Sequence, residues 1–124
     1  MARIVLADDD ELVANLVYDA CIAAGHAVGW MKDGRSALDL IRRRRPDLLI
    51  LDCNMPEVSG IMVLRELRKS PALFDLPVLM LTGRQSDADE EIVRFEGAND
   101  YLRKPFDPIE LVARAEALIK GARH

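Results

Sequence analysis

A chain of 124 residues, half of them hydrophobic and 31% charged, has the size and composition of one globular domain. Its formal net charge of −4 argues against nucleic acid as the main partner, and no apolar run is long enough to cross a membrane or to act as a signal peptide. The two cysteines, Cys21 and Cys53, lack the spacing of a metal site, which favours a reduced, cytoplasmic compartment.

The first half of the chain alternates aliphatic runs with amphipathic stretches, a pattern that indicates strands and helices in turn. Strands are expected at Arg3–Ala7, Ala27–Trp30 and Leu48–Leu51. Between them, one helix is expected at about Glu11–Ala24, and a second behind a capping aspartate, Asp33.

The third of these runs, Leu48–Leu51, does not alternate polar and apolar residues, which is typical of a strand buried on both faces of a parallel sheet. It ends at Asp52, and Pro56 and Gly60 then interrupt regular structure, so Asp52 lies where the strand passes into a loop. Open parallel sheets bind ligands at the carboxyl ends of their strands, so an acid there is placed for chemistry. Taken alone, Asp52 fits a cap of the next helix equally well.

The second half of the chain continues the alternation. The expected elements are a helix at about Val58–Lys69, a strand at Pro77–Leu81, a helix near Asp87–Glu96, a strand at Asp100–Arg103, and a helix that begins at Pro108 behind the cap Asp107. Five strand–helix units predict an α/β fold. With right-handed crossovers, this is a doubly wound, five-stranded parallel sheet with helices on both faces.

Polar side chains follow four of these strands, at the point where each strand ends: Asp8 and Asp9, Asp52, Thr82 and Lys104. Parallel strands place their carboxyl ends at one edge of the sheet, and the first strand is normally central, so the three acids are expected to converge. Converging carboxylates repel one another unless protons or a cation relieve the charge, and a hard ion such as Mg²⁺ prefers oxygen ligands. A lysine and a hydroxyl beside them suit phosphoryl transfer to an aspartate. The alternative, a set of unrelated caps and surface charges, has to hold at four strand ends at once.

In these residues the chain resembles the response-regulator receiver domains of two-component signalling, the family of the chemotaxis regulator CheY. The matching residues are Asp8–Asp9 behind Ile-Val-Leu-Ala, Asp52 with Met55-Pro56 and Gly60, Thr82, and Tyr101–Phe106. The resemblance extends over the whole chain and implies that residues 1–124 form a receiver domain. It also implies a flavodoxin-like fold with the strand order 2-1-3-4-5.

By this resemblance, Asp52 is the phosphoacceptor, which takes a phosphoryl group from a histidine kinase or a histidine phosphotransfer protein. Asp9 is the main ligand of Mg²⁺, or of Mn²⁺ in its place, and Asp52 ligates the same ion. Asp8 holds a metal-bound water, and Asn54 offers its backbone carbonyl to the metal.

The resemblance also implies roles for residues of the last two strand ends. Lys104 pairs with the phosphoryl group, the Thr82 hydroxyl bonds to it, and the Lys104–Pro105 peptide bond is cis. Tyr101 is the aromatic switch: if Thr82 moves toward the phosphoryl group, the ring rotates into the space left behind. The alternative is a Tyr101 ring that is fixed at the sheet edge with its hydroxyl in water. Gly83 departs from the pattern, because the family commonly has alanine there, and glycine makes that loop more mobile.

The expected function is a phosphorylation-controlled signalling switch and not a classical enzyme. An aspartyl-phosphate phosphatase of the haloacid-dehalogenase type is an alternative, but that class requires a second acid two positions after the nucleophile, where this chain has Asn54. A flavodoxin-like cofactor binder would need a phosphate-cradling loop with glycine after the first strand, whereas Ala7–Asp10 is acidic and contains none.

The expected partners are a phosphodonor and a downstream output protein or domain, with no direct binding of nucleic acid or membrane. No output segment follows the last helix up to His124, so a stand-alone receiver or a piece of a longer protein is expected. Phe106–Arg114 resembles receivers that dimerise through the fourth helix, fifth strand and fifth helix, which makes a homodimer through that face a further expectation. Glu116 stands where those chains often have a basic residue.

Overall fold

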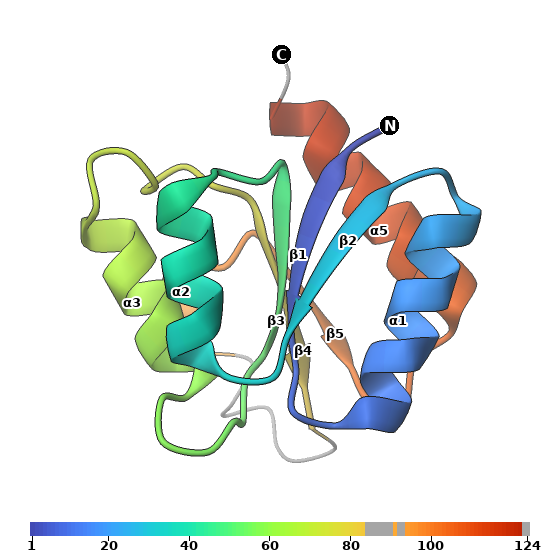
Figure 1. The fold of residues 1–124 in the computed structure, drawn as a ribbon, viewed down its shortest axis with the longest axis horizontal. Coiled ribbons are helices and arrows are strands. Elements are labelled where there is room, and N and C mark those ends of the chain that lie inside the picture. Colours follow the sequence, from blue (N-terminus) through green and yellow to red (C-terminus); the bar gives the residue numbers. More distant parts are fainter. Residues whose placement is uncertain (84–90, 92–93, 123–124) are drawn as a thin grey trace.

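The structure is a computed structural model, and it describes residues 1–83, 91 and 94–122. Its centre is a five-stranded sheet in the order β2-β1-β3-β4-β5, in which every neighbouring pair is parallel. Helices α2 and α3 cover one face of the sheet, and α1 and α5 cover the other (Figure 1). The predicted doubly wound fold and strand order are confirmed.

The elements lie close to the positions that the sequence predicts. Their bounds are β1 Arg3–Ala7, α1 Glu11–Ala23, β2 Ala27–Met31, α2 Gly34–Arg43, β3 Leu48–Asp52, α3 Gly60–Lys69, β4 Val78–Thr82, β5 Asp100–Arg103 and α5 Pro108–Ala122. Of the helix predicted near Asp87–Glu96, residues 87–90 and 92–93 lie outside the described part of the chain, whereas Glu91, Arg94 and Phe95 are helical.

Several boundaries differ from prediction by one or two residues, and two of these differences have a local reason. Helix α3 begins at Gly60 and not at Val58, because Ser59 is its N-cap, with a hydroxyl that accepts a hydrogen bond from the backbone N–H of Met62. Strand β4 begins after Pro77, which has no N–H and joins the sheet only through its carbonyl, the acceptor of the Leu49 N–H.

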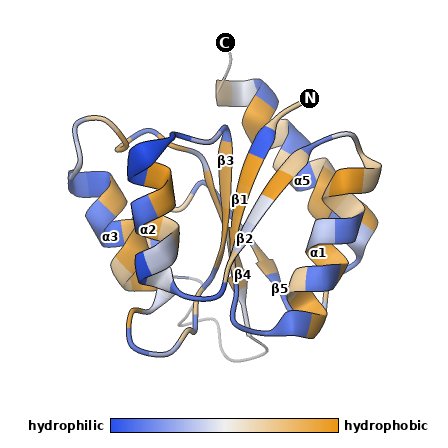
Figure 2. Ribbon diagram, in the orientation of Figure 1, coloured by the Kyte–Doolittle hydropathy of each residue, from blue (hydrophilic) through white to orange (hydrophobic). Residues whose placement is uncertain are grey.

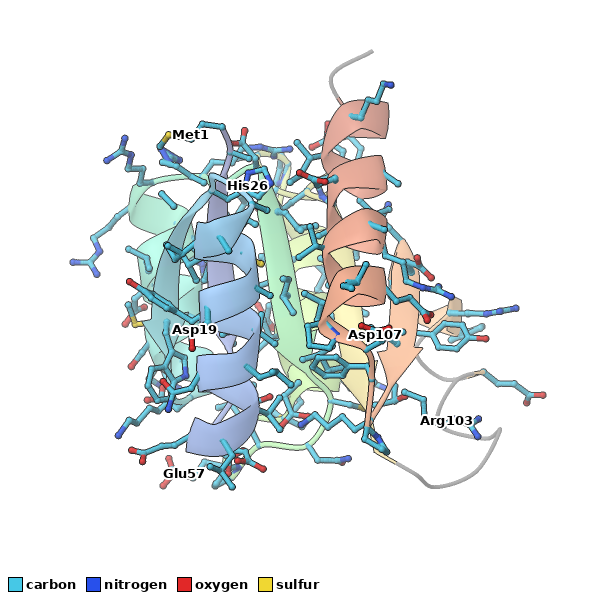
Figure 3. The ribbon with its side chains drawn as sticks, turned by 90° about the vertical axis from the view of Figure 1, so that its right-hand side faces the viewer. Met1, Asp19, His26, Glu57, Arg103 and Asp107 are labelled. Atoms are coloured by element: carbon cyan, nitrogen blue, oxygen red, sulfur yellow. The ribbon has the colours of Figure 1, made fainter. Side chains whose placement is uncertain are left out.

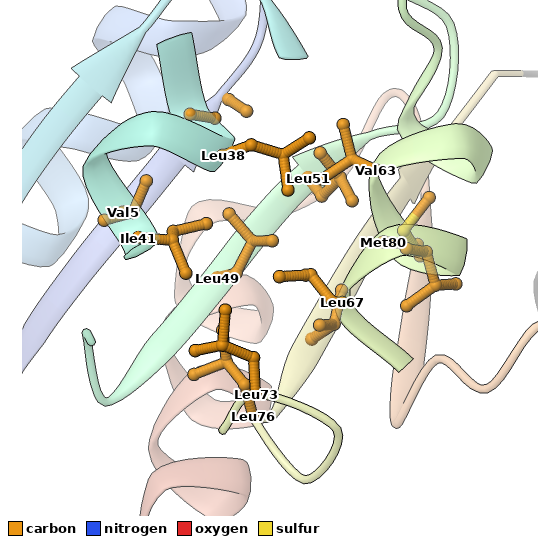
Figure 4. Close-up of a cluster of buried hydrophobic side chains, with 14 of the residues drawn as sticks. Val5, Leu38, Ile41, Leu49, Leu51, Val63, Leu67, Leu73, Leu76 and Met80 are labelled. Carbon is orange, nitrogen blue, oxygen red and sulfur yellow. The ribbon is translucent and has the colours of Figure 1, made fainter. Parts of the chain in front are cut away.

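The core lies on both faces of the sheet. All five residues of β3 and all five of β4 are buried, as the absence of alternation in Leu48–Leu51 predicts. Leu49 and Leu51 pack toward α2 and α3 (Figure 4), and Leu48 and Ile50 pack toward α1 and α5. Figure 2 shows apolar residues along the central strands and mixed surfaces on the helices. Because β3 has no exposed face, a charge at its end is enclosed by the core.

Tight turns bring the acids of the first loop to the sheet edge. Only Asp8 and Asp9 separate the end of β1 from Asp10, the N-cap of α1, whose side chain accepts hydrogen bonds from the N–H groups of Leu12 and Val13. A connection of two residues is too short to move far, so its acids stay at the carboxyl end of β1. Figure 3 places Glu57 at this end of the molecule and His26 at the opposite end.

The helices of the structure can be compared with the length and hydropathy of a membrane-spanning helix. Within residues 1–83, 91 and 94–122, no helix combines the length with the apolar character that a membrane crossing requires.

Candidate functional site

Three carboxylates meet at the carboxyl edge of the sheet. Asp8, Asp9 and Asp52 each offer an oxygen, and these atoms lie within 4.8 Å of one another. Strands β1 and β3 are direct neighbours with Ala7 opposite Leu51, so Asp8, which follows β1, reaches the same level as Asp52, the last residue of β3. The predicted convergence of the three acids is confirmed.

The cluster is enclosed on two sides and open on the third. Asp8 is fully buried and Asp52 is 4% exposed, whereas Asp9 is exposed. The backbone N–H of Asp10 donates to Asp8 Oδ1 over 2.9 Å, and the N–H of Asn54 donates to Asp52 Oδ1 over 3.4 Å. Asp9 is therefore the one of the three acids that faces solvent.

Lys104 brings the positive charge. Its Nζ lies 3.2 Å from Asp8 Oδ2 and 3.3 Å from Asp52 Oδ1. Burial acts to lower the pKa of Lys104, but the Asp52 and Asp8 carboxylates outweigh it and raise that pKa above its ordinary value, so the ammonium form persists. The residue is placed by β5, because its N–H donates to the Thr82 carbonyl over 2.7 Å, and its bond to Pro105 is cis.

Asp52 has a pKa that is raised to about 6. Burial is the main cause, and the charge of Asp8 adds to it, whereas Lys104 and the Asn54 N–H act in the opposite direction. Among the residues that the structure describes, three carboxylates lie beside one ammonium, so the cluster has an excess of negative charge. A bound cation would reduce the repulsion between these carboxylates.

The Thr82 hydroxyl is the unsatisfied group of the site. Thr82 is 1% exposed, and its Oγ1 finds no hydrogen-bond partner among the described residues. A buried hydroxyl without a partner costs free energy, so it calls for an explanation such as a bound water, an ion or a functional role. At the end of β4, next to β3, this hydroxyl can donate to an anion held at Asp52.

The donor set fits a hard divalent cation. Its members are carboxylate oxygens, which Mg²⁺ and Mn²⁺ prefer, and the exposed side at Asp9 leaves room for the waters that Mg²⁺ retains. The unpartnered Thr82 hydroxyl and the Lys104 ammonium fit a phosphoryl group at the same edge.

Two contacts of the site were not assigned by the sequence analysis. Gly60 packs against the turn after β3: a Cβ at this position would lie 2.9 Å from the carbonyl carbon of Asp52 and 3.0 Å from Cys53 Cα. Trp30 donates its indole N–H to the backbone carbonyl of Asp8 over 2.8 Å. A glycine soon after a strand-end acid is a usable signal for the first contact. No local pattern signals the second.

Tyr101 lies apart from the acids, in β5. Its ring packs against the core on the α2 and α3 side, and its hydroxyl accepts a hydrogen bond from Arg94 Nη2 over 2.7 Å. The Arg94 guanidinium also lies 4.8 Å from the ring centroid. The hydroxyl thus faces a guanidinium and not only water, which differs from the fixed-ring alternative in the sequence analysis.

A doubly wound sheet of this order with acids, a lysine and a threonine at its carboxyl edge defines a CheY-like α/β domain. The family model of the response regulator receiver domain matches residues 4–116. The chain therefore belongs to the response-regulator receiver family of two-component systems.

Individual relatives give the same result. The chain is 42% identical over 118 residues to the response regulator MprA of Mycolicibacterium vanbaalenii, a match that covers 95% of this chain and 50% of MprA. Among solved structures, it resembles the signal receiver domain of a signal transduction histidine kinase from Syntrophus aciditrophicus, with a TM-score of 0.91 and 28% sequence identity. This match covers 98% of the present chain and 92% of the other. For the Vibrio cholerae chemotaxis protein CheY4, the TM-score is 0.88 and the sequence identity 30%, and the match covers 95% of the present chain and 98% of CheY4. The chain spans about half the length of the curated relatives it matches.

Proposed function

We propose that residues 1–124 act as a receiver domain that accepts a phosphoryl group on Asp52 from a histidine kinase or a histidine phosphotransfer protein. The observation that carries the proposal is the buried Asp52 carboxylate, which lies 3.3 Å from the Lys104 ammonium. Thr82, at the end of the neighbouring strand β4, has a buried hydroxyl without a hydrogen-bond partner among the described residues. A carboxylate oxygen of Asp52 attacks phosphorus, and the bond from phosphorus to the donor histidine nitrogen breaks with its electron pair left on that nitrogen.

The chain's own residues divide the work of this transfer. Asp8, Asp9, Asp52 and the backbone carbonyl of Asn54 would hold Mg²⁺, or Mn²⁺ in its place, which supplies positive charge to the phosphoryl oxygens. Lys104, now shared between Asp8 and Asp52, turns its ammonium to a phosphoryl oxygen.

The signal follows from the hydrogen bond that Thr82 gains. Donation from its hydroxyl to the phosphoryl group draws the side chain toward Asp52, and Tyr101, on the neighbouring strand, moves into the space that becomes free. This movement breaks or rearranges the bond from Arg94 to the Tyr101 hydroxyl. The surface around β5 and α5 changes as a result, and an output protein, an output domain or a second copy of this chain binds there.

The product of this chemistry is a signal and not a released metabolite, so we propose a cytoplasmic switch and not an enzyme with an exogenous substrate. Hydrolysis of the aspartyl phosphate at the same site returns the domain to its resting state.

The test is intact-mass analysis after incubation with acetyl phosphate. The parent protein should gain one phosphoryl group when Mg²⁺ is present and none when the metal is chelated. The Asp52→Asn protein, folded as judged by circular dichroism, should gain none. A mass gain of the same extent in both proteins, or a gain that is independent of the metal, would remove Asp52 from this role.

A further inference from the structure

Trp30 reaches the acidic loop from the neighbouring strand. It lies in β2 opposite Leu6 of β1, and its indole ring packs on the α1 and α5 side of the sheet. From there Nε1 donates to the backbone carbonyl of Asp8 over 2.8 Å. The next residue of β2, Met31, accepts the N–H of Asp8 over 3.1 Å. Both backbone polar groups of Asp8 are therefore held by β2.

The two backbone hydrogen bonds of Asp8 influence the direction in which Asp9 leaves β1. The carbonyl of Asp8 and the N–H of Asp9 belong to one planar peptide unit, so a bond to the carbonyl fixes the plane from which Asp9 departs. The Asp8 carboxylate has its own restraints, namely Lys104 and the Asp10 N–H. In the part of the chain that the structure describes, no side chain or backbone group bonds to the exposed Asp9 carboxylate. As far as the described residues are concerned, the backbone is therefore what orients Asp9.

The Lys32 ammonium lies over the indole ring of Trp30. Lys32 Nζ lies 5.5 Å from the centroid of the Trp30 ring and forms an ion pair of 3.1 Å with Glu11, the first residue of α1. Because both charged side chains of this pair are exposed, the pair restrains the ring only weakly, and the hydrogen bond to the Asp8 carbonyl is the contact that orients the indole N–H.

We infer that Trp30 is a positioning residue of the cation site: its N–H bond to the Asp8 carbonyl orients the Asp8–Asp9 peptide and so holds the Asp9 carboxylate in the cluster. The inference rests on the proposed function, in which Asp9 is a ligand of Mg²⁺. The side chain of Trp30 itself touches neither the cation nor the phosphoryl group.

The test compares Mg²⁺ affinities measured by isothermal titration calorimetry, a readout that requires no phosphorylation. Trp30→Phe keeps an aromatic ring against the core and Lys32 but removes the N–H donor. It should raise the Mg²⁺ dissociation constant about 2- to 10-fold, the range expected for one neutral hydrogen bond. Val28→Ala is the matched control, because Val28 packs on the same face of β2 without a bond to Asp8, and its dissociation constant should stay at the parent value.

A second variant separates the hydrogen bond from the shape of the ring. The chain contains one tryptophan, so biosynthetic replacement of tryptophan by benzothienylalanine changes residue 30 alone and substitutes sulfur for the N–H. This protein should show the same loss of Mg²⁺ affinity as Trp30→Phe. In the metal-free state of both variants, ¹⁵N relaxation should report a more mobile Asp9 amide and an unchanged Asn54 amide.

The outcomes are distinct. If the parent binds Mg²⁺ and both changes at residue 30 leave its affinity and the Asp9 amide unaltered, the role of Trp30 is wrong and the proposed function stands. If Val28→Ala weakens binding as much as Trp30→Phe, the effect is general destabilisation, and the inference is also overturned. If the parent itself does not bind Mg²⁺, the cation site of the proposed function fails and the role of Trp30 fails with it.

Discussion

The Lys104 ammonium lies 3.3 Å from Asp52 Oδ1, yet the pKa of Asp52 is raised to about 6. Lys104 divides its charge between two buried carboxylates, because Asp8 Oδ2 lies 3.2 Å from the same nitrogen. One shared cation does not offset the burial of Asp52 and the repulsion from Asp8. The resting site therefore holds electrostatic strain that a divalent cation would relieve.

The raised pKa predicts how stability depends on pH without metal. Between the ordinary carboxyl value of 3.8 and about 6, the folded protein binds a proton at Asp52 that the unfolded chain has lost, so this residue makes the fold less stable as pH rises through that range. Asp52→Asn should therefore be more stable than the parent at pH 7.5 in chelator, by about 1–3 kcal/mol, and the gain should shrink near pH 4.

Urea unfolding of the two proteins at both pH values measures this difference. A parent that is the more stable protein at pH 7.5 would show that the pair with Lys104 outweighs burial and repulsion.

Gly60 is expected to be essential for the close packing of α3 against the turn that begins at Asp52. A Cβ at residue 60 would overlap the carbonyl oxygen of Asp52, and backbone cannot move aside as a flexible side chain can. Gly60→Ala should destabilise the fold by about 1–3 kcal/mol or more, as measured by thermal unfolding. Gly121→Ala is the control, since nothing lies within 4 Å of its added Cβ in α5, and it should be neutral or slightly stabilising. Equal stabilities of the two variants would contradict the packing described.

Asp9→Ala should separate metal binding from folding. Changes to residues that only support metal ligands typically cost about 10–100-fold in affinity, so loss of a direct ligand should cost at least that much for Mg²⁺. The metal-free fold should be as stable as the parent or more so, because one of three mutually repelling acids is gone. Asp19→Ala, which removes an exposed acid from α1, is the control for net charge. If calorimetry gives the same Mg²⁺ affinity for Asp9→Ala and Asp19→Ala, Asp9 is not a ligand.

Thr82→Ala should uncouple phosphorylation from the response of Tyr101. Without the hydroxyl, Asp52 should still accept a phosphoryl group, but nothing would draw residue 82 toward it. NMR spectra with and without beryllofluoride, which stands in for the phosphoryl group, should show shift changes at Tyr101 and Arg94 in the parent and much smaller ones in the variant. Thr82→Ser keeps the hydroxyl and should respond like the parent. Parent-like shifts in Thr82→Ala would mean that the coupling runs through other residues.

The sheet and the acid cluster are predictable from the sequence because they depend on local patterns. Four aliphatic residues without alternation at Leu48–Leu51 place β3 in the centre, and a parallel sheet then brings Asp8 and Asp52 together. Caps such as Asp10 and Asp33 are equally local, since they bond to N–H groups two or three residues ahead.

Contacts between distant residues are the part that local patterns do not provide. The indole of Trp30 meets a carbonyl 22 residues earlier in the chain, and a guanidinium reaches the Tyr101 hydroxyl from Arg94. Both depend on side-chain direction in the folded state, and the two donors, Trp30 and Arg94, lie outside the motif residues. That the Thr82 hydroxyl has no partner among the described residues is likewise a property of the folded chain and not of a local sequence pattern.

The role of Asp52 as phosphoacceptor can be tested by locating the aspartyl phosphate bond that forms. An aspartyl phosphate is reduced by borohydride to homoserine, so protein treated with acetyl phosphate and Mg²⁺ and then with borohydride carries a permanent mark at the acceptor. Peptide mass spectrometry should find homoserine at residue 52, and Asp8 and Asp9 should remain aspartate. Homoserine at Asp8 or Asp9 with residue 52 unchanged would contradict the role of Asp52 as the phosphoacceptor.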